Sequence, residues 1–179
     1  MGDYLNMENT IETLYREAIR QYGRDIARFV AGYERASPTR QELLQEVHLA
    51  LWQSFAGFAH QCSLRTWVYR VAHNVGVSHV QRSMRRLDVT AVCLDDVEAQ
   101  IDESADMGMT ERRLDLERIM ALVHTLAGID REVMLLYLED LDASSIADVT
   151  GLSARNVATK VHRIKILLAS LLANGRKSA

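Results

Sequence analysis

The chain has few residues of the kinds that break helices or favour extended structure. Proline occurs once, at Pro38, and aromatic residues make up 6% of the 179 residues. Proline interrupts helices and aromatic residues are enriched in strands. Alanine, leucine, arginine and glutamate are abundant, and apolar residues at 48% are enough to form hydrophobic cores. The composition therefore favours an all-helical protein.

The sequence also lacks the signals of secreted and membrane proteins. Two cysteines, Cys62 and Cys93, are too few for a disulfide framework, so we interpret them as the reduced thiols of a cytoplasmic protein. There is no apolar run of about 18 residues, and no signal peptide is visible. We therefore expect no membrane span and a cytoplasmic location.

Motifs for catalysis, metal binding and nucleotide binding are missing as well. The chain has no Gly-x-Ser-x-Gly, no phosphate-binding loop and no glycine-rich dinucleotide turn. His60 lies close to Cys62, and His48 is one loop away, but no Cys-x-x-Cys or His-x-x-x-His pair exists. We expect no enzyme activity, no metal and no cofactor.

Charge is divided into blocks along the chain. The net charge of −3 argues against nucleic-acid binding, but residues 47–87 contain no acid, residues 88–106 contain acids and no base, and residues 152–179 contain no acid. Basic stretches of this kind are typical of surfaces that bind phosphates. The distribution, unlike the total, favours nucleic acid as a ligand.

The apolar spacing predicts four helices in a first domain at residues 8–87. Gly23 separates the first two helices, a capping box at residues 39–42 begins the third, and Ser63 caps the fourth. We expect these helices at residues 8–22, 24–33, 39–55 and 63–86.

The acidic stretch predicts a flexible linker at residues 88–109, followed by a second domain at residues 110–173. In that domain, residues 111–126 have an amphipathic helical pattern, and Asp130 is the expected cap of a helix at residues 133–138. The predicted fold is therefore all-α, with two helical domains joined by a flexible acidic linker.

The stretch Leu141–Lys165 has the pattern of a helix-turn-helix whose second helix is basic. Ala147 allows a close approach of the two helices, Gly151 can adopt the positive φ of the turn, and Val157 packs the second helix onto the first. Ser153 is a good N-cap for that second helix. A cationic helix presented in this way suits the major groove of DNA.

Several short motifs resemble those of bacterial extracytoplasmic-function sigma factors. Resemblance to sigma domain two is carried by Leu14–Glu17 (LYRE), Glu42–Val47 (ELLQEV), Leu51–Trp52 and Leu64–Asn74 (LRTWVYRVAHN). Resemblance to sigma domain four is carried by Arg131–Leu136 (REVMLL), Ser145–Ala147, Gly151–Ser153 and Val161–Arg163. The resemblance covers roughly residues 10–172, and its strength is the presence of two motif sets in the right order.

The resemblance implies a factor that binds core RNA polymerase, at its clamp coiled coil and flap, and directs initiation at specific promoters. The docking residues it implies are Glu42, Gln45 and Glu46. For the −10 element, which is melted and read, they are Phe58, His60, Gln61, Arg65, Arg70, Asn74 and Arg82. For the −35 element they are Arg155, Asn156, Thr159, Lys160 and Arg163.

Elementary chemistry is consistent with these roles. Phe58, His60 and Gln61 offer ring faces and hydrogen-bonding groups to an unstacked base. Arg155 and Asn156, at the start of the recognition helix, can reach base edges, whereas the later basic residues suit phosphates. The arginines of residues 65–82 could instead form an ordinary solvated face, and Tyr69 fits core packing as well as base stacking.

The helix start before Leu43 departs from the family pattern. Family members commonly have Asp-Ala-Glu-Asp there, and this chain has Thr39, Arg40, Gln41 and Glu42. The loss of acids weakens the expected attraction to a basic partner. Phosphate on Thr39, or on the neighbouring hydroxyl of Ser37, would restore negative charge where the helix polarity tolerates it. The alternative is that both hydroxyls cap the helix.

Two other functions fit the same motifs. A stand-alone helix-turn-helix regulator would use the first domain for dimerisation and would bind duplex DNA without polymerase. A sigma mimic would titrate an anti-sigma factor and would have no need of the basic faces, which this chain keeps. The sequence leaves open whether an anti-sigma factor binds the chain.

Overall fold

The computed structural model describes residues 2–89 and 119–175, and every regular element in these ranges is helical. The N-terminal half, residues 2–89, contains α1 (Gly2–Ala31), α2 (Ser37–Ser54), a 3-10 turn (Phe55–Gly57) and α3 (Leu64–Val89). The C-terminal half, residues 119–175, begins with a helical segment at 119–125. It continues with α5 (Gly128–Leu138), α6 (Ala143–Thr150) and α7 (Ala154–Gly175). The all-α prediction is confirmed.

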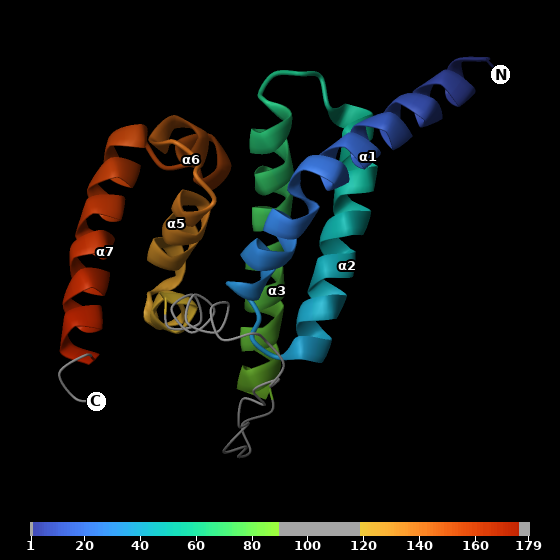
Figure 1. Cartoon of the computed structure of the whole chain (residues 1–179). Coiled ribbons are helices and arrows are strands. Elements are labelled where there is room, and N and C mark those ends of the chain that lie inside the picture. The colour runs from blue at the N-terminus through green and yellow to red at the C-terminus, as the bar shows by residue number, and fades with distance from the viewer. Residues whose placement is uncertain (1, 90–118, 176–179) are drawn as a thin grey trace, which may run out of the picture.

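The N-terminal half is a bundle of three long helices. In Figure 1, α2 and α3 run side by side in opposite directions, and α1 crosses them. Leu43, Val47 and Leu51 recur every four residues on one face of α2 and are fully buried. This spacing places them on the side of the helix that faces the core.

Two expected helix boundaries in this half are wrong. Gly23 does not separate two helices, because α1 continues through it to Ala31. One glycine weakens a helix without ending it, and Ala18 before it and Ile26 after it are both buried. The capping box at residues 39–42 does not form either. The N-cap of α2 is Ala36, with no side-chain cap, and Pro38 lies in the first turn. Proline is favoured there because its φ is already helical and no N–H is needed.

Ser63 caps α3 as predicted. Its Oγ accepts a hydrogen bond from the Thr66 backbone N–H at 3.0 Å, and its carbonyl accepts from the Trp67 N–H. The two bonds satisfy donors that the first turn of a helix leaves without partners. The helix then extends to Val89, slightly beyond the predicted end.

In the C-terminal half, Asp130 does not act as the predicted cap. Helix α5 starts earlier, at Gly128, and its N-cap Ala127 makes no side-chain bond. Asp130 lies in the first turn, where a carboxylate interacts favourably with the helix dipole. The predicted linker, apart from its first two residues, and the beginning of the predicted amphipathic helix lie outside the described residues.

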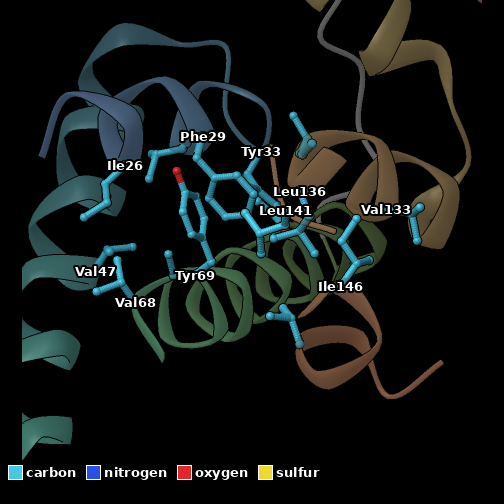
Figure 2. Packing of buried hydrophobic residues seen from close by; sticks show 14 of the residues in the cluster. Ile26, Phe29, Tyr33, Val47, Val68, Tyr69, Val133, Leu136, Leu141 and Ile146 are labelled. Atoms are coloured by element: carbon cyan, nitrogen blue, oxygen red, sulfur yellow. The ribbon is translucent and has the colours of Figure 1, made fainter. Parts of the chain in front are cut away.

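The two halves pack against each other and share one core. Figure 2 shows Phe29, Tyr33 and Tyr69 of the N-terminal half beside Leu136 and Leu141 of the C-terminal half. Helix α3 contacts α6 directly. The described helices include none with the length and apolarity needed to span a membrane.

Candidate nucleic-acid interface

Helices α6 and α7 form the predicted helix-turn-helix. Asp142 caps α6 by accepting a hydrogen bond from the Ser145 N–H at 2.7 Å, and this bond lowers the pKa of the Asp142 carboxyl. Gly151 ends α6 in the left-handed region, at φ 77°. Ser153 Oγ accepts from the Asn156 N–H at 3.3 Å at the start of α7, and Val157 is fully buried. The turn, the cap and the packing residue were all predicted correctly.

The first turns of α7 present polar side chains to solvent. Arg155, Asn156, Thr159 and Arg163 are all exposed. Thr159 donates its hydroxyl to the Arg155 carbonyl at 2.9 Å. Within the described ranges, Arg155 and Arg163 form no ion pair, so their guanidinium groups are available to an external anion.

Lys160 differs from the other predicted residues of α7. Its Nζ lies 2.6 Å from Oδ1 of Asp130 at the start of α5, and the side chain is only 21% exposed. The pair joins α5 to α7. Lys160 is therefore already neutralised within the protein, and it would have to leave Asp130 to contact a phosphate fully.

Of the three loop residues before α3 that are predicted to contact the −10 element, two face solvent and one is buried. His60 and Gln61 are exposed, and His60 has a positive φ of 54°. Phe58 is buried. The centroid of its ring lies 5.2 Å from that of Trp67 and 4.5 Å from that of His60. The expectation that Phe58 offers a free ring face is wrong, because the loop folds this ring into the core.

Two of the three predicted basic residues of α3 have partners from distant parts of the chain. Arg65 Nη2 donates to the backbone carbonyl of Glu139, and Arg82 Nη2 lies 2.5 Å from Oε2 of Glu46. The Nε atoms of Arg65 and Arg70 are buried and have no hydrogen-bond partner in the described structure. Asn74, by contrast, is exposed. An ordinary solvated face therefore describes Arg82, which is 49% exposed, but not Arg65 and Arg70, whose Nε atoms are buried.

The predicted docking residues lie along α2. Glu42 and Gln45 are exposed, and Leu49 further along the helix is 58% exposed. Glu46 forms an ion pair with Arg82, so one predicted docking residue is paired with one predicted DNA-binding residue. Ser37 is exposed and Thr39 is half-buried; since Ala36 is the N-cap, neither hydroxyl occupies the capping position.

Glu139 is a buried carboxylate whose contacts no pattern in the sequence indicates. It is 4% exposed, yet its carboxylate accepts hydrogen bonds from Arg28 Nε at 2.8 Å, Arg28 Nη2 at 2.6 Å and Tyr69 OH at 3.0 Å. The contact with Glu139 raises the pKa of the Arg28 guanidinium, and burial, reinforced by Glu139, raises that of the Tyr69 hydroxyl. The donors are 111 and 70 residues away in sequence, beyond the reach of any local pattern.

A second polar cluster crosses between the halves near the middle of α3. Tyr33 OH lies 3.0 Å from His73 Nδ1, and His73 Nε2 lies 3.7 Å from a Glu132 oxygen. Burial lowers the pKa of His73 to about 4 and raises the pKa of the Glu132 carboxyl. The imidazole is therefore neutral near pH 7. Within the described residues, no group of three His, Cys, Asp or Glu side chains is arranged to hold a metal.

Comparisons with known proteins agree with this architecture. Residues 18–86 match the family model for sigma-70 region 2, and residues 116–168 match a model for sigma-70 region 4. Together the two matches cover more than half of the chain.

Individual proteins give the same result. RNA polymerase sigma factor YlaC of Bacillus subtilis is 23% identical over 94% of this chain and 95% of its own length. ECF RNA polymerase sigma factor SigG of Mycobacterium tuberculosis is 39% identical over 26% of this chain and 12% of its own length.

A solved structure supports the fold. CnrH, in a complex with the cytosolic domain of CnrY, superposes with a TM-score of 0.67 at 17% identity, covering 95% of this chain and 94% of CnrH. The two family matches occur in the same order as the two helical halves, and the second contains the helix-turn-helix built from α6 and α7. The chain accordingly belongs to the sigma-70 family, as an extracytoplasmic-function sigma factor that directs transcription initiation.

Proposed function

We propose that the chain docks on the clamp coiled coil and flap of core RNA polymerase, reads the −10 element with α3 and the loop before it, and reads the −35 element with α7. The observation that carries the proposal is the exposed start of α7, where Arg155 and Asn156 face solvent directly after the turn of the helix-turn-helix. Such a factor works in the cytoplasm with its polymerase and needs no catalytic residue of its own.

For the −35 element, Arg155 and Asn156 contact base edges and Arg163 contacts the phosphate backbone. Thr159 can donate to a phosphate when its hydroxyl leaves the Arg155 carbonyl. Arginine and asparagine can each make two hydrogen bonds to a purine in the major groove. Residues near the N-terminus of a recognition helix are the ones that reach base edges. Lys160 adds a phosphate contact when it leaves Asp130.

For the −10 element, His60, Gln61 and Asn74 are the exposed groups that can hold an unstacked base or a sugar edge. Arg70 and Arg82 hold the backbone, and Arg65 joins them when it is released from the Glu139 carbonyl. Phe58 supports the loop from below through its contact with Trp67.

Polymerase docking uses the exposed polar face of α2, with Glu42 and Gln45 in contact with the clamp and Glu46 shared with Arg82. Phosphorylation of Thr39, or of Ser37, would strengthen docking by adding about −1.5 to −2 charges near the helix start. CnrH was solved with a cytosolic protein domain bound, which supports an anti-sigma factor as a further partner of this chain.

The test is run-off transcription with core polymerase on a library of promoter fragments. Wild-type protein should produce transcripts from a subset of promoters, and core polymerase alone should not. Specific binding to duplex DNA without polymerase would favour a stand-alone regulator instead. Failure to bind DNA with or without polymerase would favour a sigma mimic.

The Arg155→Ala variant tests, in the same assay, whether Arg155 contacts a base of the −35 element. A promoter set randomised across the −35 element should lose preference at one position, whereas Lys160→Ala should weaken all promoters similarly. Unchanged base preferences in the Arg155→Ala variant would contradict the assignment.

A further inference from the structure

Trp67, in the first turn of α3, is tied to the end of α2 by a hydrogen bond that spans the loop between the two helices. Its indole Nε1 donates to Ser54 Oγ at 3.0 Å, and the Ser54 hydroxyl donates in turn to the Leu51 carbonyl at 2.9 Å. The direction of both bonds is fixed, because an indole N–H can only donate and the hydroxyl has a single hydrogen. We call this chain of two bonds the Ser54–Trp67 tether.

The Trp67 ring is the innermost of three rings that lie in a row through the loop. The ring centroids of Trp67 and Phe58 are 5.2 Å apart, and those of Phe58 and His60 are 4.5 Å apart. Trp67 is half-buried, Phe58 is buried and His60 is exposed. The row therefore leads from the tether to the surface, and His60 is its outermost ring.

The backbone of the loop is fixed on both sides of His60. The Phe58 N–H donates to the Phe55 carbonyl at 3.2 Å, and Ser63 caps α3 through the Thr66 N–H. His60 itself has a φ of 54°, which residues other than glycine seldom adopt. Such a backbone persists only where its surroundings hold it, and it occurs preferentially at functional sites.

We propose that Ser54 and Trp67 are positioning residues for promoter opening. Their tether holds Phe58 and, through it, the His60 ring in place for an unstacked base of the −10 element. The inference rests on the proposed role of this loop, and it adds two residues that act without contacting DNA. A ring that is fixed before binding loses less conformational entropy when a base stacks on it, so the base is held more tightly.

The first experiment tests the tether in the full chain without polymerase or DNA. Trp67→Phe keeps an aromatic ring and removes the N–H donor, and Ser54→Ala removes the acceptor. The imidazole proton resonances of His60, assigned by comparison with His60→Gln, depend on the ring current of Phe58. Both variants should shift these resonances, and the double variant should shift them by less than the sum of the two, as expected for residues in direct contact.

Ser170→Ala is the matched control for the loss of a serine hydroxyl. The Ser170 hydroxyl donates to the Leu167 carbonyl three residues earlier in α7, as Ser54 does to Leu51 in α2. This variant should leave the His60 resonances unchanged, and circular dichroism checks that all variants keep their helix content. Wild-type resonances of His60 in both Ser54→Ala and Trp67→Phe would overturn the proposal.

The second experiment measures base capture by the holoenzyme. The probes are a single-stranded oligonucleotide with the non-template −10 sequence of a responsive promoter, and a set in which one position at a time is abasic. Wild type should bind one abasic strand more weakly than the intact strand. Trp67→Phe and Ser54→Ala should bind the intact strand roughly threefold to tenfold more weakly than wild type, as expected for weakening one stacking contact. They should bind that one abasic strand as wild type does.

The abasic strand separates positioning from folding. A variant that only folds poorly would bind every strand more weakly, including the abasic one, and this result would overturn the proposal. Unchanged binding of the intact strand by both variants would overturn it as well. If wild type distinguishes no abasic strand, the proposed capture of a base by the loop fails, and the His60 resonances still decide whether the tether positions the ring.

Discussion

The two basic helices of this sigma factor differ in how their cations are used. On α7, Arg155 and Arg163 are exposed, and only Lys160 is engaged among the predicted basic residues. On α3, Arg65 is bound to the Glu139 carbonyl and Arg82 to the Glu46 carboxylate. Both stretches are free of acids in sequence, so the same pattern produced two different surfaces.

The difference shows what an acid-free stretch of sequence can and cannot reveal. Helix α7 lies at one side of the molecule, and Asp130 pairs with its Lys160. Helix α3 is central and packs against α1, α2 and α6, and Glu46 of α2 pairs with its Arg82. Absence of local acids therefore does not by itself predict free cations, because acids from elsewhere in the chain pair with cations on both helices. The following experiments test this contrast, starting with the largest effect.

The central position of α3 depends on the close packing of the two halves, which Gly32→Ala should disrupt. The added methyl group would overlap Leu135, which is nearly fully buried. We therefore expect a loss of about 3 kcal/mol in the free energy of unfolding of the protein. Urea denaturation measures the loss. Gly57→Ala is the control, because a Cβ at Gly57 meets no atom within 4 Å. Equal stability of the two variants would show that the halves do not depend on this contact.

The exposed cations of α7 should matter more for promoter binding than the paired cation of α3. Arg155→Ala in the holoenzyme should weaken binding to a cognate promoter by about 2 kcal/mol, as expected for one bidentate base contact. Arg82→Ala should cost less, because Glu46 already neutralises that guanidinium. Competition binding with a fluorescent promoter fragment gives both values. A larger loss for Arg82→Ala would reverse the comparison.

Buried groups along α3 also predict a pH dependence. Burial lowers the pKa of His73 from 6.5 to about 4 in the folded protein, so between these values the unfolded state binds more protons. The free energy of unfolding should therefore fall as the pH drops through 6.5 towards 4. His73 alone should account for a loss of about 1.8 kcal/mol between pH 7 and pH 5. Glu132, whose pKa is raised by burial, acts in the opposite direction.

Urea denaturation of wild type and His73→Gln at pH 7 and pH 5 measures how much of the loss in unfolding free energy comes from this histidine. His162→Gln, at an exposed position of α7, is the control and should keep the wild-type pH dependence. If His73→Gln loses as much stability on acidification as wild type, the buried imidazole is not the cause.

The smallest effect concerns the pair between α2 and α3. Glu46 and Arg82 are 43% and 49% exposed, and a pair of this kind contributes about 0.5 kcal/mol because solvent screens it. A double-mutant cycle with Glu46→Gln and Arg82→Gln, followed by urea denaturation, should give a coupling energy of this size. A coupling energy near zero would mean that Arg82 is as free as the cations of α7.

Local elements were predictable where neighbouring residues determine them. The turn at Gly151, the cap at Ser153 and the buried Val157 of the helix-turn-helix follow from residues within a few positions of each other. The cap of α3 by Ser63 is of the same kind. The predicted capping box and the cap at Asp130 failed because Pro38 and residues 127–128 start their helices a few positions earlier.

Site residues were predictable only in part. Arg155, Asn156, Glu42, Gln45 and Asn74 are exposed, as their predicted roles require. Phe58 is not, since its ring belongs to the core beneath the loop. The binding roles of all these residues stay predictions until the experiments above are done.

The sequence by itself determined the helical class, the helix-turn-helix and the family, because helix periodicity, caps and short motifs are local properties of the chain. The tertiary structure alone decided which charges are free. Glu46 pairs with Arg82, 36 residues away. The carboxylate of Glu139 binds Tyr69 and Arg28, which are 70 and 111 residues away, and no sequence pattern connects these residues. Ion pairs and burial depend on distance in space, and that distance is set by how the helices pack rather than by the order of residues along the chain.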